Sequence, residues 1–358
     1  MSDSLEHLRQ QIDQLDEQLL AVLNERGRLV KQVGETKEKK GTPVFAPGRE
    51  AELIKRLKQK NEGPLPNQAI EGVFREVVHA CRSLQKTFRI AFFGPEATFT
   101  HQAAIKAFGQ QTTMIPSRTI PDVFAEVEKG RADYGVVPIE NSTEGVVNHT
   151  LDMFVESGLS ICAELQLPIG HYLLGRQKDY PKKIKTLFSH YQAMAQCSRW
   201  VDKHLKGIRY IECSSTADAA HQAQQTPGSV AIASRLAAEL YSLDVLEQRI
   251  EDSTQNYTRF YVIGKTEPAK TGRDKTSIMF SVKDKVGALV DMLVPFKRYK
   301  LNMTKIESRP TRQKAWEYVF FVDFWGHRSE PQVQKALQEL EKSCLFLKTL
   351  GSYPRTDL

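Results

Sequence analysis

An apolar stripe that repeats every seven positions in the first 33 residues constrains the fold of this chain more than any other feature. Its two registers are Leu5, Ile12, Leu19 and Val33, and Leu8, Leu15, Val22 and Leu29. Such spacing predicts a long helix with a coiled-coil-like seam. At about 1.5 Å per residue this helix is roughly 45 Å or longer, which a small domain cannot cover by itself. We therefore expect a second copy of the chain to bury the seam.

Two shorter helical patterns follow the long helix, at residues 49–60 and 68–84. They are separated by Gly63-Pro64-Leu65-Pro66, which is typical of a loop. The first 86 residues are therefore predicted to form an all-helical domain.

The pattern changes at residue 89, where short β-rich runs begin to alternate with helical segments. The runs lie at residues 90–93, 134–137, 230–232 and 260–263. This alternation predicts α/β architecture to about residue 264. The polar stretch 266–274 is followed by the order strand, helix, strand, strand, helix, strand, which predicts a ferredoxin-like α+β module. Because one core rarely organises 358 residues, we expect domains at 1–86, 88–266 and 274–358.

Composition excludes several classes of function. The chain has no long uncharged apolar run of the kind that spans a bilayer. Its first twenty residues carry charges throughout, unlike a secretory signal, so a cytoplasmic location is expected. The net charge of +7 comes from Lys and Arg residues interspersed with acids, which argues against a nucleic-acid partner. Small anionic substrates explain this excess as well as an ordinary solvated surface does.

Neither a metal nor a redox cofactor is indicated. The chain has five cysteines that lie far apart and form no C-x-x-C pair: Cys81, Cys162, Cys197, Cys213 and Cys344. We expect reduced thiols and no metal site. The chain also lacks a G-x-G-x-x-G motif, which weakens a nicotinamide-dependent interpretation.

Arg26 interrupts the apolar seam, because continuing the register of Leu5 by sevens reaches this residue. A guanidinium in such a place needs a carboxylate, since a buried charge without a partner is costly. The carboxylate can belong to a ligand, which the planar fork of arginine suits, or to a glutamate of a partner chain. Arg9 and Lys37 lie near the same seam.

An ordered set of motifs runs through the helical region. It consists of Leu8-Arg9-x-x-Ile12-x-x-Leu15-Asp16, Glu25-Arg26, Gly34-x-x-Lys37, Arg49-Glu50 and Gln85. Over residues 1–86 this set resembles the all-helical chorismate mutase family. The resemblance implies an intertwined dimer in which Arg9 reaches into the partner's site, and the site is completed by Arg26, Lys37, Arg49, Glu50 and Gln85. The chain departs from the family at Ala46, where some members have a carboxylate, and at Cys81, where serine is common.

The implied reaction rearranges chorismate, which carries two carboxylates, to prephenate. Such a concerted shift needs positioning and charge complementarity and no nucleophile. The resemblance assigns Arg9 and Arg26 to the carboxylates and Glu50 to the ring hydroxyl. Lys37 and Gln85 are the expected catalytic residues, because each can donate to the ether oxygen on which negative charge grows.

A second set of motifs lies in residues 89–264. It consists of Gly94-Pro95-Glu96-x-Thr98-Phe99, Val137-Pro138-Ile139-Glu140-Asn141-Ser142, Gln192-Ala193-x-Ala195-Gln196-Cys197, Ser214-Ser215-Thr216-Ala217 and Asn256-x-Thr258-Arg259-Phe260. This set resembles prephenate dehydratase along the full length of the segment. It implies two α/β lobes, folded like a two-lobed ligand-binding protein of the periplasmic type, with the substrate in the cleft between them. Ala97 stands where glycine is common in the family.

Prephenate loses carbon dioxide and its ring hydroxyl together, so the enzyme needs one acid and several donors. The resemblance points to Thr258 as the essential hydroxyl, which orients or relays a proton. Glu140 is the second candidate for the acid, if the cleft raises its pKa. Arg259 either pairs with a substrate carboxylate or holds the loop.

Several neutral side chains are expected to bind the anionic groups of the substrate in the cleft. They are Asn141, Ser142, Gln196, Ser215 and Thr216. Each has a structural alternative, because Ser214-Ser215 can cap a helix and Asn141-Ser142 can hold a turn. Phe260 is included as a substrate contact, with a position in the strand core as its alternative.

Two tetrapeptides mark residues 275–350, namely Gly287-Ala288-Leu289-Val290 and Glu307-Ser308-Arg309-Pro310. Together they resemble an ACT regulatory domain of the phenylalanine-responsive kind, and all eight residues are expected to bind the effector. Free N–H groups after Gly287 suit an amino-acid carboxylate, and Glu307 suits its ammonium group. We expect phenylalanine to bind between the modules of two chains and to lower dehydratase activity.

The three resemblances together imply a bifunctional enzyme of phenylalanine synthesis, which needs no cofactor and is a homodimer or a larger homo-oligomer. The alternative is a non-catalytic two-lobed binding protein or sensor fused to a ligand-responsive domain, but it leaves the N-terminal cations unexplained. A fusion of a mutase with a dehydrogenase is disfavoured, because no dinucleotide fingerprint is present.

Overall fold

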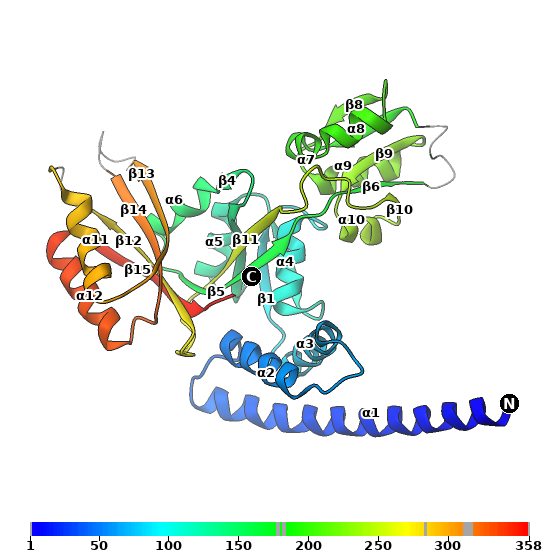
Figure 1. The fold of residues 1–358 in the computed structure, drawn as a ribbon, viewed down its shortest axis with the longest axis horizontal. Coiled ribbons are helices and arrows are strands. Elements are labelled where there is room, and N and C mark those ends of the chain that lie inside the picture. Colours follow the sequence, from blue (N-terminus) through cyan, green and yellow to red (C-terminus); the bar gives the residue numbers. More distant parts are fainter. Residues whose placement is uncertain (1, 177–179, 181–183, 283–284, 311–317, 357–358) are drawn as a thin grey trace. The chain divides into compact units, whose positions relative to one another are not determined.

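The computed structural model describes residues 2–176, 180, 184–282, 285–310 and 318–356 (Figure 1). The chain divides into two compact units. Residues 1–88 and 108–113 form unit 1, and residues 89–107 and 114–358 form unit 2. In the part of the chain that is described, no helix combines the length and the apolar character that a bilayer crossing requires.

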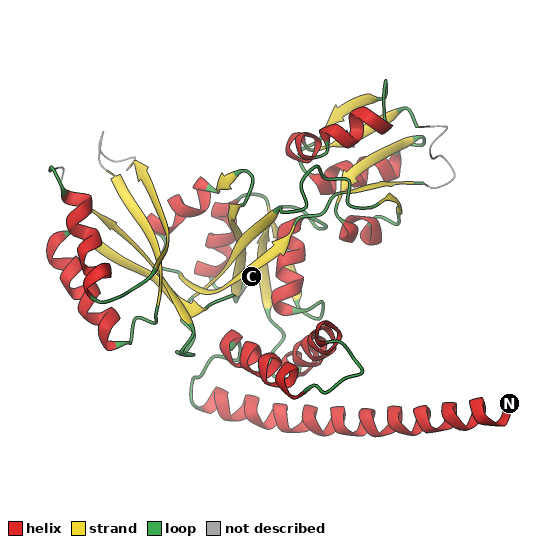
Figure 2. Cartoon of the chain, in the orientation of Figure 1, coloured by secondary structure: helices red, strands yellow, loops and turns green. Residues whose placement is uncertain are grey.

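Residues 2–83 of unit 1 form helices joined by loops, so the predicted all-helical character is confirmed (Figure 2). Its helices are α1 (Ser2–Lys39), α2 (Pro47–Lys60) and α3 (Asn67–Ser83). The N-terminal half of α1 extends past α2 and α3 (Figure 1). All eight side chains of the heptad stripe are between 49% and 65% exposed, so the chain itself does not cover its seam.

Two glycines, seven residues apart on α1, bring this helix against the end of α3. A Cβ atom on Gly34 would lie 2.8 Å from Cγ of Gln85, and one on Gly27 would lie 3.2 Å from Cδ1 of Leu84. Neither contact leaves room for a larger side chain at the glycine. The close approach of α1 therefore fixes the position of Gln85.

The first lobe of unit 2 is a six-stranded sheet with the order β2-β1-β3-β11-β5, and β4 pairs with β3. Its strands are β1 (Arg89–Phe93), β2 (Thr113–Ser117), β3 (Tyr134–Asn141), β4 (Gly145–Val146), β5 (Ser160–Pro168) and β11 (Tyr257–Gly264). Its helices are α4 (Phe99–Phe108), α5 (Ile120–Glu128) and α6 (Asn148–Glu156). Strand β11 comes from far along the chain and lies between β3 and β5, antiparallel to both.

The second lobe is a five-stranded sheet with the order β10-β6-β9-β7-β8. Its strands are β6 (Tyr172–Gly175), β7 (Thr186–Ser189), β8 (Arg209–Glu212), β9 (Ser229–Ala233) and β10 (Asp244–Glu247). Its helices are α7 (Tyr191–Gln196), α8 (Ser198–His204), α9 (Thr216–Gln225) and α10 (Arg235–Leu240). The chain passes between the lobes twice, through residues 169–171 and 248–256, so the predicted two-lobed architecture is confirmed.

The C-terminal module has the predicted order of elements. They are β12 (Asp274–Ser281), α11 (Ala288–Arg298), β13 (Met303–Pro310), β14 (Tyr318–Trp325), α12 (Pro331–Ser343) and β15 (Phe346–Pro354). The strands form an antiparallel sheet with the order β13-β14-β12-β15. This order is that of a ferredoxin-like fold, as expected.

Both faces of this sheet are covered, and by different parts of unit 2. Phe280, Val322 and Phe324 pack with residues of α11 and α12. On the other face, Phe321 and Tyr353 share a hydrophobic core with side chains of the first lobe. The module is therefore joined to the first lobe through a common core, which its separate sequence pattern did not reveal.

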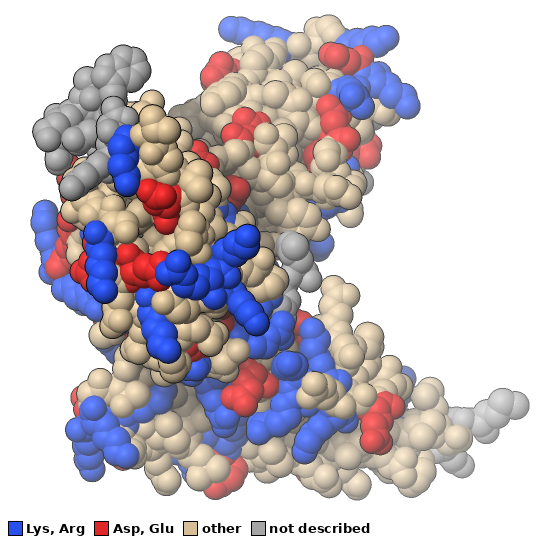
Figure 3. Space-filling model, turned by 60° about the vertical axis from the view of Figure 1, so that its left-hand side comes forward, with Lys and Arg blue, Asp and Glu red and all other residues tan. Residues whose placement is uncertain are grey.

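Charges of both signs are distributed over the surface. On the face shown in Figure 3, acidic side chains lie among the more numerous basic ones. This distribution agrees with the interspersed Lys, Arg, Asp and Glu residues in the sequence.

Candidate active sites

Arg26 offers a buried donor to an anion in unit 1, and Gln85 has a buried acceptor without a partner in the described part of the chain. Nη1 of Arg26 and Oε1 of Gln85 are both buried and make no hydrogen bond among the described residues. Further along α1, Nζ of Lys37 donates to the carbonyl oxygen of Val44 at 3.2 Å, and burial lowers the pKa of Lys37 against the opposing effect of Glu50. Buried polar atoms without a partner are rare, because each loses its hydrogen bonds to water and gains none within the protein.

Glu50 forms an ion pair that the sequence did not predict. Its Oε1 accepts from Nη1 of Arg82 at 2.7 Å, and the side chain of Arg82 is only 4% exposed. Burial raises the pKa of Glu50, and the charge and hydrogen bond of Arg82 oppose that effect. Arg82 was not singled out from the sequence, since one arginine on the third helix carries no motif of its own.

The remaining predicted residues of unit 1 are exposed. Arg49 is 68% exposed and lies 3.5 Å from Glu52, one helical turn away. Arg9 is exposed on the half of α1 that extends past α2 and α3 (Figure 1). Its placement agrees with a role in a partner's site, which stays a prediction.

Thr258 and Asn141 lie opposite each other on β11 and β3 in unit 2. Nδ2 of Asn141 donates to Oγ1 of Thr258 at 2.8 Å and to Oδ1 of Asn256 at 2.9 Å. Oδ1 of Asn141 accepts the backbone N–H groups of Thr143 and Glu144. Because the oxygen of Thr258 already accepts a hydrogen bond, its own proton is directed elsewhere.

Gln196 connects this pair to the second lobe. Its Oε1 accepts from Nδ2 of Asn256 at 2.9 Å and lies 2.9 Å from Nε2 of His171, and its Nε2 donates to Glu144 at 3.3 Å. Since an amide oxygen only accepts, Nε2 of His171 carries the proton. Burial lowers the pKa of His171, so the ring is neutral and its unprotonated Nδ1 has no partner among the described residues.

His171 and Asn256 lie on the two segments that pass between the lobes, and neither was proposed as a site residue from the sequence. Asn256 stands two residues before Thr258 in a motif that the sequence had identified, which was a usable signal. His171 had none, because its contact with Gln196 joins residues 25 positions apart.

Ser142 and Ser215 take the structural roles that the sequence left open. The hydroxyl of Ser142 donates to the carbonyl of Gln255 at 3.1 Å and accepts from the N–H of Tyr257 at 3.0 Å. Ser215 caps α9 by accepting from the N–H of Asp218 at 3.0 Å, and Thr216 is the first residue of that helix. A capped N-terminus of this kind can also bind an anion.

Arg259 is directed away from the Thr258 hydroxyl. Its guanidinium binds Glu164 on β5 at 2.7 Å and Asp323 on β14 at 2.8 Å, and it lies over the ring of Tyr261. Of its two expected roles, a substrate carboxylate or structural support, this geometry favours support. It ties the first lobe to the C-terminal module.

Glu140 and Phe260 need a similar revision. Oε2 of Glu140 accepts from Nζ of Lys305 on β13 at 2.9 Å, so its carboxylate is paired with a cation of the C-terminal module. Phe260 is 1% exposed and lies in the core, which leaves its ring no surface for a substrate.

The two tetrapeptides of the C-terminal module lie on α11 and β13. Gly287 precedes α11 with a φ of +79°, a left-handed conformation that favours glycine, and Val290 is 64% exposed. Glu307 pairs in register with Phe321 of β14, and Ser308 and Pro310 are exposed. Arg309, expected to bind effector, donates instead to Asp152 of α6 at 2.9 Å.

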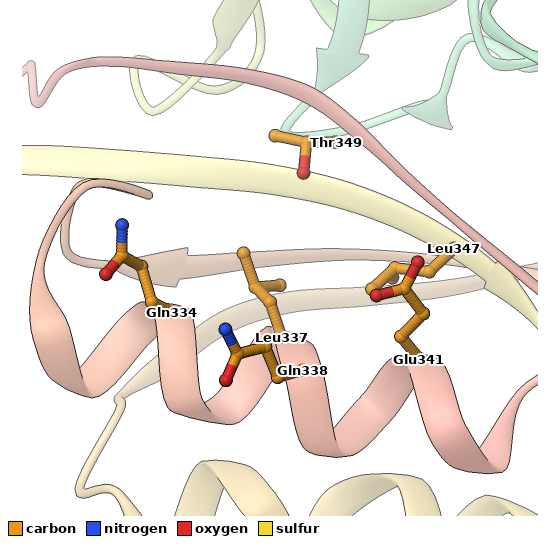
Figure 4. Close-up of a pocket in the computed structure, with 6 residues that line it drawn as sticks. All are labelled: Gln334, Leu337, Gln338, Glu341, Leu347 and Thr349. Atoms are coloured by element: carbon orange, nitrogen blue, oxygen red, sulfur yellow. The ribbon is translucent and has the colours of Figure 1, made fainter.

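A hollow of about 370 Å³ lies between α12 and β15 (Figure 4). It is lined by Gln334, Leu337, Gln338, Glu341, Leu347 and Thr349. None of the residues predicted to bind a substrate or effector belongs to this set. Within the described residues, no three His, Cys, Asp or Glu side chains are grouped as a metal ion would require.

Comparison with known proteins identifies the three regions. The chorismate mutase type II family model matches residues 8–86, the prephenate dehydratase model matches residues 90–268, and the ACT domain model matches residues 276–342. The bifunctional chorismate mutase/prephenate dehydratase of Aquifex aeolicus is 47% identical over 357 residues, which cover 99% of this chain and 98% of the relative. The chain belongs to the family of bifunctional chorismate mutase/prephenate dehydratases.

Two solved structures resemble the dehydratase and ACT regions of this family member. The prephenate dehydratase of Arthrobacter aurescens in complex with L-Phe is 36% identical with a TM-score of 0.69, covering 75% of this chain and 90% of its own. A protein described as GqqA, a novel type of quorum quenching acylase, is 30% identical with a TM-score of 0.69, covering 75% of this chain and 98% of its own.

Proposed function

We propose that this chain performs its family's two reactions at two separate sites, one in unit 1 and one in unit 2. It is a bifunctional enzyme of phenylalanine biosynthesis, an isomerase that rearranges chorismate and a lyase that converts prephenate to phenylpyruvate. The corresponding domains are residues 1–86, 88–266 and 274–358, and the site of action is the cytoplasm.

Chorismate binds in unit 1, where the buried Nη1 of Arg26 is a donor that lacks a partner among the residues described. This observation supports the mutase assignment most directly. Arg26 holds a carboxylate of chorismate, together with Arg49 and with Arg9 of a second chain. Lys37 and Gln85 donate to the ether oxygen as its bond breaks, and Glu50 accepts from the ring hydroxyl. The rearrangement gains speed from fixed charges that match the transition state better than the substrate.

Prephenate binds beside Thr258, near the segments that join the two lobes. Its ring carboxylate leaves as carbon dioxide, and the electron pair that remains aromatises the ring and expels the ring hydroxyl. A proton relayed through Thr258 converts the departing hydroxide to water. Because Oγ1 of Thr258 accepts a hydrogen bond from Nδ2 of Asn141, the hydroxyl proton of Thr258 points elsewhere and can be donated. Gln196, with Ser215 and Thr216 at the N-terminus of α9, holds the anionic groups of the substrate, while Asn141 and Ser142 keep their hydrogen bonds within the protein.

Two chains associate through the exposed stripe of α1. Eight apolar side chains at heptad spacing are half exposed in one chain, and a second copy buries them as a coiled-coil seam. The same association brings Arg9 into the partner's site.

Phenylalanine acts as a feedback inhibitor at the ACT modules of two chains, near residues 287–290 and 307–310. The relative from Arthrobacter aurescens was solved with L-Phe. Strand β13 carries the second of these segments and also contacts the first lobe through Lys305–Glu140 and Arg309–Asp152. Binding that shifts β13 therefore alters the strand on which Asn141 lies.

One assay tests the catalytic proposal. The purified chain, given chorismate and no cofactor, is expected to form prephenate and then phenylpyruvate, and to slow when phenylalanine is added. A non-catalytic sensor would bind prephenate without consuming it, and an acylase would leave it intact. Failure to form either product would contradict the proposal.

A further inference from the structure

Arg82 is a charged side chain in the interior of unit 1 that has no role in the family assignment above. It lies near the end of α3 and is 4% exposed. Moving a guanidinium out of water is costly, and an ion pair with good geometry is needed to compensate. The pair is with Glu50, the proposed ligand of the ring hydroxyl, at 2.7 Å.

Two aromatic rings hold the guanidinium in place. Its Cζ lies 5.3 Å from the ring centroid of Phe45 and 5.4 Å from that of Phe108. The two ring centroids are 4.7 Å apart, and both side chains are buried. A cation over aromatic faces is attracted by the negative potential of each ring, which fixes its direction as well as its position.

Phe108 lies far from the helical region in the sequence. It is the last residue of α4, inside the segment that matches prephenate dehydratase, yet residues 108–113 belong to unit 1. Two further contacts join this segment to α3: Oγ of Ser83 donates to Oε1 of Gln111 at 3.0 Å, and Gly109 lies against the ring of His79. The mutase unit is therefore built partly from a dehydratase segment.

We propose that Arg82 is a positioning residue of the mutase site, which Phe45 and Phe108 hold so that Glu50 presents an oriented, charged carboxylate to the ring hydroxyl of chorismate. This inference rests on the proposed role of Glu50. Arg82 itself touches no substrate and acts through Glu50.

The charges around Glu50 give this role a pH signature. Arg82 and Arg75 face it from α3 and Lys37 faces it from α1, while Arg49, on its own helix, lies near Glu52. Burial raises the pKa of Glu50, and these three cations oppose the effect. Removing Arg82 raises that pKa further, so mutase activity is lost at a higher pH as the solution is acidified.

The test uses the full chain and two substitutions, Arg82→Met and Arg82→Lys. Arg82→Met is expected to lower mutase kcat/KM by about 10- to 100-fold, as a small misplacement of a binding group can. It is also expected to move the acid limb of the pH profile upward, and Arg82→Lys should restore much of both. Far-UV circular dichroism reports whether the helical unit is folded, and dehydratase turnover of supplied prephenate reports on unit 2. Arg56→Met, an exposed arginine on the helix of Glu50, is the matched control.

A double-mutant cycle with Glu50→Gln separates this inference from the function on which it rests. If Arg82 acts through Glu50, its substitution costs little in the Glu50→Gln background. Additive losses, an unmoved acid limb, or an equal loss in Arg56→Met would overturn the inference while leaving the role of Glu50 intact. Full mutase activity of Glu50→Gln would instead overturn the role of Glu50 and the inference with it. Should Arg82→Met not fold, the cycle is run with Arg82→Gln, which also removes the charge, and additive losses again decide against the inference.

Discussion

The two proposed active sites differ in the hydrogen bonding of their central side chains. In unit 1, Arg26 and Gln85 keep buried atoms without a partner. In unit 2, Thr258, Asn141, Asn256 and Gln196 bond to one another in a continuous chain. Nη1 of Arg26 is therefore available to a carboxylate of the substrate, whereas the second site must exchange internal hydrogen bonds for bonds to the substrate.

This difference matches the chemistry of the two reactions. A concerted rearrangement needs a fixed pattern of charge and no proton transfer, so preorganised cations suffice. Loss of hydroxide needs a proton delivered to the leaving oxygen, and a chain of hydroxyl and amide groups can direct one. Substitutions are therefore expected to have smaller effects the farther they lie from the reacting atoms.

The largest effect is expected for Thr258→Ala. Without the hydroxyl, the proposed relay is broken, and dehydratase kcat should fall by about 10²- to 10⁴-fold, the usual contribution of a positioned proton donor. Mutase activity should be unchanged, so chorismate should accumulate as prephenate in a coupled assay. Asn141→Ala is expected to show the same pattern more weakly. Loss of mutase activity in a folded Thr258→Ala protein would contradict the two-site assignment.

A smaller effect, with a pH signature, is expected for Gln85→Glu. At neutral pH the carboxylate cannot donate to the ether oxygen, and mutase kcat should fall by about 10²-fold, as on loss of one transition-state donor. Activity should recover as the pH falls through the pKa of the new carboxyl group, because its protonated form donates again. Dehydratase turnover of prephenate serves as the control, and a flat mutase profile would argue against Gln85 as the donor.

The third prediction concerns the contacts between the ACT module and the first lobe. Lys305→Met removes the ion pair with Glu140 without touching the tetrapeptide that begins at Gly287. Phenylalanine should still bind by calorimetry, while the concentration needed for half inhibition should rise about 2- to 30-fold, as for a coupling loss of about 0.5 to 2 kcal/mol. Lys342→Met on α12 is the matched control, since that lysine is exposed. Unchanged inhibition in Lys305→Met would exclude this route.

The smallest effect is expected at Ala97, which has a φ of +68° where glycine is common in the family. In Ala97→Gly, the left-handed backbone no longer strains a side chain, which stabilises the folded state by about 1 to 2 kcal/mol. Loss of the buried methyl group and the greater conformational freedom of glycine in the unfolded chain both oppose this gain. The free energy of unfolding should change by less than about 1 kcal/mol. Ala97→Val should destabilise the second unit more, and urea unfolding distinguishes the two. Equal stability of the glycine and valine variants would mean that the backbone here is not strained.

The sequence predicted the elements of this fold better than their partners. Heptad spacing located α1, and turn residues with alternating strands located the ACT module, because both signals are local. The pairs Arg82–Phe108, Gln196–His171 and Glu140–Lys305 were missed. Each joins residues that are distant along the chain, and periodicity shows which face is apolar without showing what covers it.

The same limit explains the roles that changed. Arg259 and Arg309 stand in motifs, and a ligand contact was expected for Arg309 and was one of two expected roles for Arg259. Both bind carboxylates of the protein across the boundary between lobe and module. An arginine fork suits either kind of carboxylate, so residue type alone does not distinguish a ligand contact from a structural one.

The common core of Phe321 and Tyr353 with the first lobe has a practical meaning for anyone who wants a version of this enzyme freed from feedback control. Deleting the module after residue 274 would expose the apolar side chains of the lobe that the module covers. The exposed apolar surface would favour aggregation. A desensitised catalyst is therefore better obtained by retaining every residue of the module and altering single side chains at its ionic contacts. The sequence presents the module as a separate domain, but its side chains complete the hydrophobic core of the first lobe.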